Sequence, residues 1–223
     1  MQERYARNIP ALSREECELL QRKTVAVIGC GGLGGHIIEL LARVGVGTLR
    51  VVDGDVFDST NLNRQLLSRE AVLGKSKALE AAERVRSVNS QVAVEAVPEF
   101  LTENNAQTIL SGCDAVVDGL DSIAARRVLA MACRRAGIPY VYGAISGWVA
   151  QAAVIAPEDR SPELLFPEGK EGTDKSVLSF TPALCASIQA SLCVKLLTGR
   201  RVETGTLFYF DLLHQEFEQI PLL

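Results

Sequence analysis

The sequence lacks the features that membrane-bound and nucleic-acid-binding proteins share. Its 223 residues carry a net charge of −4, whereas proteins that bind nucleic acids present a basic surface to the phosphates. No apolar run approaches the ~18 residues of a membrane-spanning helix, and the opening MQERYARNIP has no apolar core of the kind found in signal peptides. We therefore expect a cytoplasmic protein with no nucleic-acid partner and no membrane contact.

The sequence also lacks paired cysteines. None of the six stands in a C-x-x-C pair; they are Cys17, Cys30, Cys113, Cys133, Cys185 and Cys193. Zinc sites of the ribbon and finger types are built from such close pairs, so we expect no zinc. Unpaired cysteines in a reducing compartment are mostly small buried apolar residues, and we predict that role here.

No internal repeat, low-complexity tract or linker divides the chain, so we expect a single domain over residues 1–223. A domain of this length buries about 70% of the surface of its unfolded chain. It therefore needs neither disulfides nor a structural metal to be stable.

Apolar strands and amphipathic helices alternate along the chain as far as Gly147. Strand patterns cover 25–28, 48–52, 91–97, 114–118 and 140–142, and helix patterns cover 33–44, 76–88, 102–110 and 123–135. A capping box at Ser13 and Glu16 opens a short helix before them. This alternation predicts an α/β fold of the Rossmann-like, doubly wound type, whose mostly parallel sheet binds ligands at the carboxyl ends of its strands.

The pattern changes after Gly147. We expect a longer strand over 148–156, a helix over 182–197 and a closing pair of antiparallel strands over 207–211 and 216–220. The intervening residues 157–175 combine prolines, glycines and many charges. This segment is predicted to be too polar to pack and too long for a simple connection, which favours a mobile crossing loop.

A glycine-rich turn joins the first core strand to the next helix. The sequence GCGGLGG places glycines at Gly29, Gly31, Gly32 and Gly34, where any Cβ would block the turn and hold a phosphate away from the backbone N–H groups. Asp53 ends the second core strand, and a carboxylate at that position can accept hydrogen bonds from ribose hydroxyls. These features predict a bound nucleotide, for which NAD is the usual interpretation.

The residues that follow favour ATP instead. Asn61, Arg64 and Lys77 place two fixed cations beyond the ribose carboxylate. This is more positive charge than a pyrophosphate on a helix terminus requires, and a triphosphate does require it. An NAD-dependent oxidoreductase stays open as an alternative, although it offers no role for Arg64 and Lys77.

Seven motifs along nearly the whole chain resemble those of the ThiF/MoeB/HesA family, the bacterial relatives of ubiquitin-activating enzymes. They are RYARN, GCGGLGG, DGD-x5-NLNRQ, GKSK, VVDGLDS, GA-x6-Q and IQ-x5-K. The resemblance implies an adenylyltransferase that activates the C-terminal glycine of a ubiquitin-like sulfur carrier such as ThiS or MoaD and releases pyrophosphate. Thiamine and molybdopterin biosynthesis are both open as its pathway.

The resemblance also implies a division of labour along the chain. Residues 1–23 form a helical arm, 24–147 the nucleotide-binding core, and 148–223 the portion that binds the carrier and forms dimer contacts. It implies a homodimer in which Arg7 of one protomer reaches the site of the other, and a carrier whose tail ends in Gly-Gly.

The implied site binds ATP and Mg²⁺. Asp53 holds the ribose, Arg64 and Lys77 act on the phosphates together with Asn61, and Asp121 ligates the metal; with Arg7 the catalytic set is Arg7, Arg64, Lys77 and Asp121. The residues implied to contact the nucleotide are Gly29, Gly31, Gly32, Gly34, Asp53, Asp55, Asn61, Arg64, Gln65, Lys77 and Asp121.

The chain departs from the family pattern in its cysteines. It has neither of the C-x-x-C zinc pairs of many members, and the place of their acceptor cysteine falls near Thr173–Lys175, where there is none. We therefore expect adenylation without a covalent transfer step, and a packing role for Cys185. A nucleotide-holding scaffold that recruits a carrier without activating it is a second alternative, and a different peptide or a nucleoside carboxylate as substrate is a third.

Overall fold

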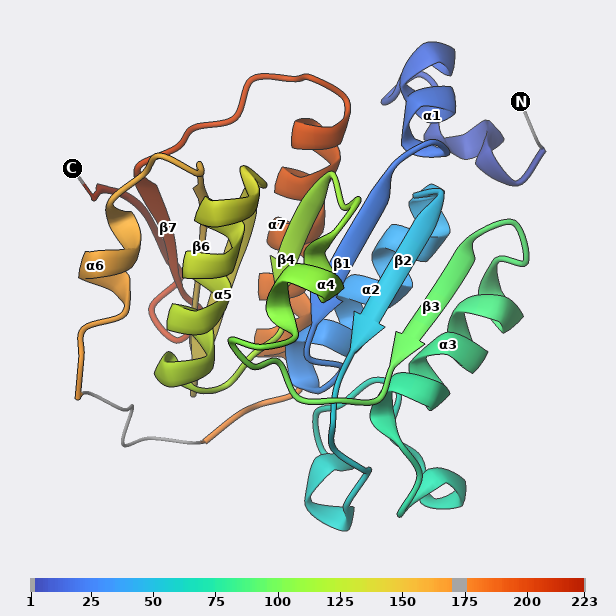
Figure 1. Cartoon of the computed structure of the whole chain (residues 1–223), viewed down its shortest axis with the longest axis horizontal. Coiled ribbons are helices and arrows are strands. Elements are labelled where there is room, and N and C mark those ends of the chain that lie inside the picture. Colours follow the sequence, from blue (N-terminus) through green and yellow to red (C-terminus); the bar gives the residue numbers. More distant parts are fainter. Residues whose placement is uncertain (1–2, 170–175, 223) are drawn as a thin grey trace.

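The computed structural model describes residues 3–169 and 176–222. Eight strands form one sheet in the order β3-β2-β1-β4-β5-β6-β7-β8. Neighbours from β3 to β5 pair in parallel, and those from β5 to β8 pair antiparallel. The predicted α/β fold with antiparallel C-terminal strands is thus confirmed (Figure 1).

The strands are β1 (Thr24–Ile28), β2 (Thr48–Val52), β3 (Ala93–Val97), β4 (Ala115–Asp118), β5 (Tyr140–Ser146), β6 (Val149–Ile155), β7 (Thr206–Asp211) and β8 (Glu216–Pro221). The α-helices are α1 (Arg14–Leu20), α2 (Gly32–Val44), α3 (Lys77–Val88), α4 (Ala106–Leu110), α5 (Ile123–Ala136), α6 (Ser161–Leu165) and α7 (Phe180–Leu197). Short 3-10 helices are η1 (Glu3–Asn8), η2 (Ser59–Asn61) and η3 (Glu70–Val72).

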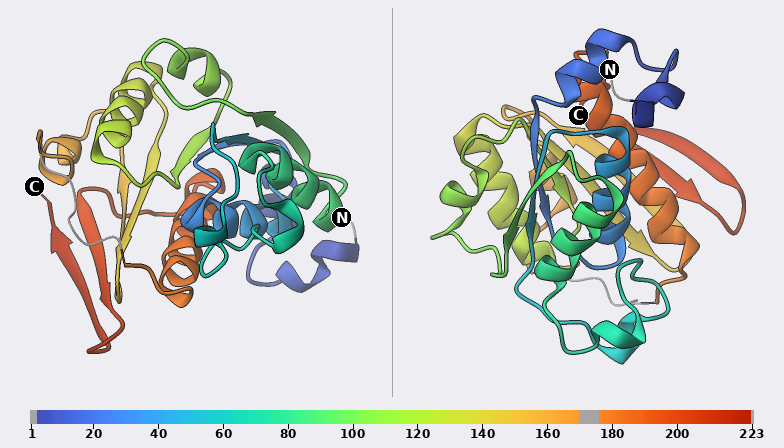
Figure 2. Two further views of the ribbon diagram at one scale, coloured as in Figure 1. Left: turned by 90° about the horizontal axis from the view of Figure 1, so that it is seen from below. Right: turned by 90° about the vertical axis from the view of Figure 1, so that its right-hand side faces the viewer.

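Helices cover both faces of the sheet (Figure 2). On one face, side chains of β1 such as Val25 and Val27 pack with α2, α3 and α7. On the other face, Ala26 and Ile28 pack with α4 and α5. Burial on both sides explains why β1 reads as a continuous apolar run, since a central parallel strand has no solvent-facing side.

The strand order reverses between β1 and β4, which lie side by side although β2, β3 and their helices separate them in the sequence. Connections from adjacent strands then leave in opposite directions, and the carboxyl ends of the strands open onto a crevice where α/β proteins bind ligands. Here that edge carries the turns that begin at Gly29, Asp53 and Gly119.

Part of the segment predicted to be too polar to pack is packed. Residues 161–165 form α6, and Phe166 is 2% exposed with its ring centroid 5.3 Å from that of Tyr142. The prediction was wrong for this part because Phe166 and the partly buried Leu165 suffice to anchor a short helix among charges, although Leu164 stays exposed. Residues 170–175 of the predicted mobile loop lie outside the described residues.

Helix α7 is long and apolar enough, by length and composition, to cross a membrane. The sequence analysis predicted no apolar stretch of that length. Half of that stretch is buried inside the protein, where it packs between α2 and strands β4 to β6. A helix that covers the centre of a sheet needs an apolar surface, so packing accounts for its composition.

Candidate active site

The glycine turn after β1 is packed against the turn after β4. Gly29 has a φ of +94°, and a Cβ on it would lie 2.5 Å from the carbonyl oxygen of Gly119. A Cβ on Gly34 would overlap the carbonyl oxygen of Gly29. Both positions therefore require glycine for the fold itself, because the two turns and the first turn of α2 touch through their backbones.

Gly31 and Gly32 differ from these neighbours. A Cβ on Gly31 would lie 3.5 Å from Gln65 Nε2, and one on Gly32 would lie 3.9 Å from the nearest atoms, Cγ of Arg64 and Cβ of Pro182. These are ordinary contact distances, so packing does not require glycine there. Their missing side chains instead leave the start of α2 open to an approaching group.

No side chain of the described residues makes a capping hydrogen bond to the N-terminus of α2. The N-cap is Gly31, which makes no side-chain hydrogen bond to the helix, and no acidic residue occupies the first turn. The first N–H groups of a helix have no partner within it and carry a partial positive charge. This end of α2 is therefore suited to a phosphate.

Asp53 links β2 to the glycine turn. One carboxylate oxygen accepts a hydrogen bond from the backbone N–H of Cys30 at 2.7 Å, and the other accepts from the N–H of Asp55 at 2.9 Å. A carboxylate has about four acceptor positions, so capacity for ribose hydroxyls is left. The bond to Cys30 shows a second role, which no motif indicates: Asp53 fixes the turn.

Lys77 and Asp55 form an ion pair. Lys77 begins α3 and is only 6% exposed, and its Nζ donates to Asp55 Oδ2 at 2.6 Å. The hydrogen bond from Lys77 lowers the pKa of Asp55, whose own side chain is largely in solvent. Asp55 thus contacts a predicted phosphate-binding cation, and its predicted contact with the nucleotide itself stays a prediction.

Arg64 lies on the loop between β2 and α3, which extends beyond the carboxyl ends of the strands (Figure 1). Its Nη1 donates to the carbonyl oxygen of Thr60 at 2.8 Å and to Asn63 Oδ1 at 3.0 Å. These bonds use one of its two terminal nitrogens, and Arg64 is only partly buried beside Gly32. The guanidinium therefore keeps donors for an anion at the start of α2.

Asn61 and Gln65 lie on the same loop as Arg64, and both are 7% exposed. Asn61 Oδ1 accepts from the N–H of Asp58 at 3.1 Å and closes η2, so this amide is engaged in shaping the loop. Gln65 Oε1 is buried without a hydrogen-bond partner among the described residues. Its amide lies beside Gly31, and the phosphate and nucleotide contacts predicted for these two residues stay predictions.

Asp121 is exposed and makes no hydrogen bond or ion pair within the described ranges. The N-cap of α5 is Ser122, whose hydroxyl accepts from the N–H of Ala125 at 3.2 Å. Ser122, and not Asp121, therefore caps this helix. Among residues 3–169 and 176–222 no group of three metal-ligating side chains exists, so a metal at Asp121 would need further ligands from a substrate.

The N-terminal segment that contains η1 lies at the end of the molecule opposite the loop between β2 and α3 (Figure 1), and Arg7 is part of it. Within η1, Asn8 donates to the carbonyl oxygen of Val44 at the end of α2, and Tyr5 packs against Gly45 there. The glycine turn lies at the other end of the same helix. One chain therefore cannot bring its own Arg7 to its own predicted site.

A buried polar network lies beneath the turn after β4. Asp118 is fully buried, and its Oδ2 accepts from Arg126 Nε at 2.9 Å and from the hydroxyl of Tyr140 at 2.8 Å. Gln189 Nε2 donates to the carbonyl oxygen of Asp118 at 2.8 Å. A Cβ on Gly143 would overlap the Gln189 amide, so the glycine of GA-x6-Q and the glutamine of IQ-x5-K fit each other.

Burial sets the protonation of this network. It raises the pKa of Asp118, and the Arg126 guanidinium opposes that shift. Although burial alone would lower the pKa of Arg126, the Asp118 carboxylate raises it. Burial also raises the pKa of Tyr142, whose ring lies 5.4 Å from the guanidinium carbon, to about 12.

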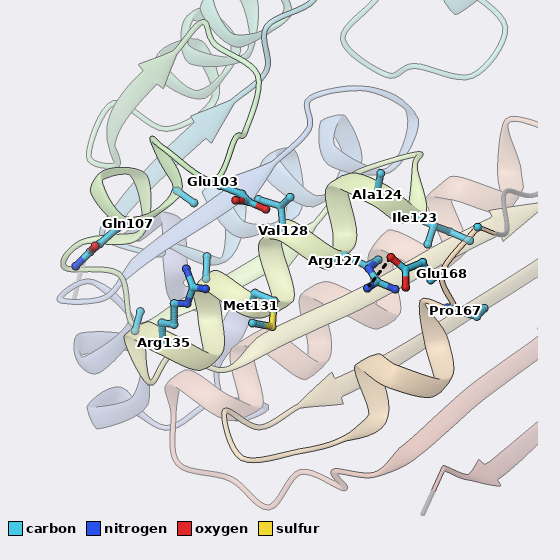
Figure 3. A pocket seen from close by; sticks show the side chains of 14 residues that line it. Glu103, Gln107, Ile123, Ala124, Arg127, Val128, Met131, Arg135, Pro167 and Glu168 are labelled. Carbon is cyan, nitrogen blue, oxygen red and sulfur yellow. Dashed lines mark ion pairs between the residues drawn. The ribbon is translucent and has the colours of Figure 1, made fainter.

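A groove of about 930 Å³ runs along α5 on the face remote from α2 (Figure 3). Its walls come from α4, α5 and residues 167–169, and Arg127 forms an ion pair of 3.8 Å with Glu168 at one end. None of the predicted nucleotide-binding residues lines it. The predicted site is instead the shallower edge around Gly31 and Asp121.

The sequence pattern of the ThiF family matches residues 5–222. The SAMP-activating enzyme E1 of Haloferax volcanii is 38% identical, and the alignment covers 98% of this chain and 84% of that enzyme. The sulfur carrier protein adenylyltransferase of Thermus thermophilus is 34% identical over 99% of this chain and 87% of that protein. The probable adenylyltransferase/sulfurtransferase MoeZ of Mycobacterium tuberculosis is 33% identical, and this chain spans 59% of its length.

Solved structures with the same fold include E. coli MccB with ATP. It superposes with a TM-score of 0.82 at 21% identity, over 100% of this chain and 71% of that chain. MccB with succinimide gives a TM-score of 0.84 at 20% identity, over 100% and 72%. Identities this low establish the fold alone, whereas the family pattern extends over almost every residue. The chain belongs to the ThiF family.

Proposed function

We propose that the chain is an ATP-dependent adenylyltransferase that activates the C-terminal glycine of a ubiquitin-like sulfur carrier protein. The names of its relatives in Haloferax and Thermus support this substrate class. The geometry supports it through one juxtaposition. The helix N-terminus of α2 and the carboxylate of Asp121 lie at one edge of the sheet, and neither has a hydrogen-bond partner from a side chain of the described residues. The loop with Arg64 and the start of α3 with Lys77 follow the neighbouring strand β2 at the same edge.

The proposed reaction joins a carboxylate to the α-phosphorus of ATP. The terminal carboxylate oxygen of the carrier attacks, the bond from the α-phosphorus to the bridging oxygen breaks, and pyrophosphate leaves with that electron pair. The products are a carrier acyl-adenylate and pyrophosphate. Because the carrier supplies the nucleophile, the enzyme contributes positioning and charge neutralisation.

The residues present suit this task. The N–H groups at the start of α2 and the side chains of Arg64 and Lys77 would hold the phosphates, and each contact at ~4 Å is worth about 1 kcal/mol in water and several where partly buried. Asp55 would keep the Lys77 ammonium aimed at the site. Asp53 would hold the ribose while it fixes the glycine turn.

Asp121 fits a magnesium ion that binds together with the substrate. Mg²⁺ is commonly held by one or two carboxylates, substrate phosphates and water molecules rather than by a full protein cage. A single exposed carboxylate without a partner among residues 3–169 and 176–222 meets this requirement. When bound there, the ion would neutralise phosphate charge during the attack.

We also propose a homodimer that completes each site with Arg7 of the other protomer. The two ends of α2 hold Arg7 and the glycine turn, respectively. Two copies packed with their α2 helices antiparallel would place Arg7 of one beside the turn of the other. We place the reaction in the cytoplasm, in keeping with six cysteines that are all free.

Carrier-dependent exchange of labelled pyrophosphate into ATP tests the proposed function. A carrier that ends in Gly-Gly should support exchange, and the same carrier without its last glycine should not. Equal exchange with the complete carrier and with the carrier that lacks its last glycine would contradict the proposed substrate class. Calorimetric binding of NADH together with no heat from ATP and Mg²⁺ would contradict the reaction itself.

A further inference from the structure

A buried ion pair holds the turn that carries Asp121. The Asp118 carboxylate accepts from the N–H of Leu120 through Oδ1 at 2.7 Å. Arg126 Nη2 donates to the carbonyl oxygen of the same Leu120 at 2.6 Å. Both backbone polar groups of Leu120, the residue directly before Asp121, are therefore fixed by one pair of side chains.

The same pair is tied into the rest of the sheet. Arg126 Nη2 also donates to the carbonyl oxygen of Gly143 on β5 at 3.1 Å, and its Nε donates to Asp118 Oδ2 at 2.9 Å. Arg126 is 8% exposed and Asp118 is fully buried. Charged groups held this way cannot move without breaking several bonds in a low-dielectric interior, so the turn has one defined position.

This turn also touches the opposite side of the nucleotide site. Gly119 donates its N–H to the carbonyl oxygen of Ile28 at 2.8 Å, and a Cβ on it would lie 2.7 Å from the carbonyl oxygen of Gly29. The Leu120 contacts therefore set Asp121 in register with the glycine turn. A shift of the turn would move the carboxylate away from any phosphate at the start of α2.

We propose that Arg126 is a positioning residue for metal binding, which orients Asp121 by clamping the carbonyl oxygen of Leu120 while Asp118 clamps its N–H. This inference rests on the proposed function. Arg126 touches neither nucleotide nor metal in this account. A guanidinium suits the role because its planar fork reaches Asp118, Leu120 and Gly143 together, which a lysine ammonium cannot do.

The test uses Arg126→Lys, with Tyr142→Phe as the matched control. The ring of Tyr142 lies over the Arg126 guanidinium and is retained in this variant. Only the hydroxyl is lost, and it accepts a hydrogen bond from Gln151. Binding of a non-cleavable α,β-methylene analogue of ATP is measured by calorimetry with and without Mg²⁺. Thermal unfolding of each variant is measured alongside.

In Arg126→Lys we expect the gain in affinity from Mg²⁺ to fall by roughly 10- to 100-fold, the usual effect of losing a residue that orients a metal ligand. Metal-free binding of the analogue should change little. Tyr142→Phe should keep the full gain from Mg²⁺ even where its unfolding temperature falls. A purely structural network would instead lower the unfolding temperature of both variants and leave the magnesium dependence intact.

A second variant guards against misfolding. Asp118→Asn combined with Arg126→Gln removes both buried charges at once, and such neutral replacement is far better tolerated than breaking a buried pair. A folded double variant that keeps the full gain from Mg²⁺ would overturn the proposal, as would a folded Arg126→Lys that does so. Absence of pyrophosphate exchange in the unaltered protein would contradict the proposed function instead. The calorimetric comparison tests only the role of Arg126 in metal binding.

Discussion

The two carboxylates of the VVDGLDS segment are used in opposite ways. Asp118 is fully buried and accepts hydrogen bonds from Arg126, Tyr140 and Leu120. Asp121, on the same turn, is exposed and has no partner among the described residues. The Asp118 carboxylate is therefore engaged in holding the fold. Among residues 3–169 and 176–222, the Asp121 carboxylate keeps all its acceptor positions for a ligand.

The glycines of the turn after β1 also fall into two groups, one required by the fold and one open to a ligand. Gly29 and Gly34 are required by backbone packing, whereas Gly31 and Gly32 face ordinary contact distances. We call Gly29, Gly34, Gly119 and Asp118 the inner layer, and Gly31, Gly32 and Asp121 the outer layer. Substitutions in the inner layer should reduce stability, and those in the outer layer should reduce activity.

The largest effect is expected for Asp121→Ala. Losing the outer carboxylate should lower carrier-dependent pyrophosphate exchange by at least roughly 10²- to 10³-fold, the scale of one lost electrostatic contact in a transition state. Stability should change by less than about 0.5 kcal/mol, since the side chain is exposed and pairs with none of the residues that the structure describes. Glu103→Ala, which removes an exposed carboxylate from the remote groove, is the control. Full exchange in Asp121→Ala would remove the role assigned to this residue.

The next effect separates the two kinds of glycine by stability. Gly34→Ala should lower the free energy of unfolding by about 3 kcal/mol or more, because the new Cβ overlaps the Gly29 carbonyl oxygen. For a domain of this size that is a fall of roughly 6–12 °C in unfolding temperature. Gly31→Ala is the control and should cost under about 1 kcal/mol. Equal losses in chemical and thermal unfolding would show that the layers do not differ.

The same comparison can be made through nucleotide binding. Gly31→Val should weaken ATP binding by roughly 10- to 100-fold, or about 1.4–2.8 kcal/mol, because the branched side chain occupies the space at the start of α2. The three atoms nearest to the new Cβ all belong to the flexible end of Gln65, so the fold should persist. Calorimetric titration with ATP and Mg²⁺ measures the change. Unaltered affinity would place the phosphates elsewhere.

The cysteines provide a qualitative test. All six are free and buried, and burial raises the pKa of Cys185 to about 12. A buried neutral thiol is a poor nucleophile, so enzyme, ATP and carrier should form no adduct that a reducing agent releases. Intact-mass spectrometry checks this, and Cys185→Ala should retain exchange. An adduct on Cys185 would instead make this chain a covalent acceptor.

The smallest effect lies far from both layers, where Arg200 holds Glu16 of α1 at 2.6 Å. The hydrogen bond from Arg200 lowers the pKa of Glu16 from 4.5 to about 2. The stabilisation is therefore complete above about pH 4.5 and disappears as the pH falls towards 2. Glu16→Gln should unfold at a lower temperature than the unaltered protein at pH 7, and the two should converge near pH 2. Exchange activity at pH 7 should be the same in both.

Most of the fold could be predicted because its signals are local. The apolar run of β1, the capping box at Ser13 and the glycine that ends α2 each report on a few neighbouring residues. The packing of Phe166 could not be predicted in this way, since it depends on Tyr140 and Tyr142 from another part of the chain.

The candidate site also contains a part that the sequence predicts and a part that it does not. Asp53, Asp121 and the glycine turn follow strand ends and were predictable as a group, because parallel strands bring their carboxyl ends together. The ion pair of Lys77 with Asp55 and the bonds that Asp118 and Arg126 make to Leu120 depend on distances across the fold. The motifs contain all of these residues except Arg126, and they do not indicate which of them touch.

The position of Arg7 determines which site of the proposed dimer a mutation in one chain inactivates. Each polypeptide would lend its arginine to a neighbour and borrow one in return. In a mixed pair, a lesion at Arg7 of one chain and a lesion at Asp121 of the other would therefore fall in the same site and leave the second site intact. Co-expressed Arg7→Ala and Asp121→Ala chains, each silent alone, would then rebuild one intact centre between them. Complementation of this kind would make the working unit the pair rather than the polypeptide.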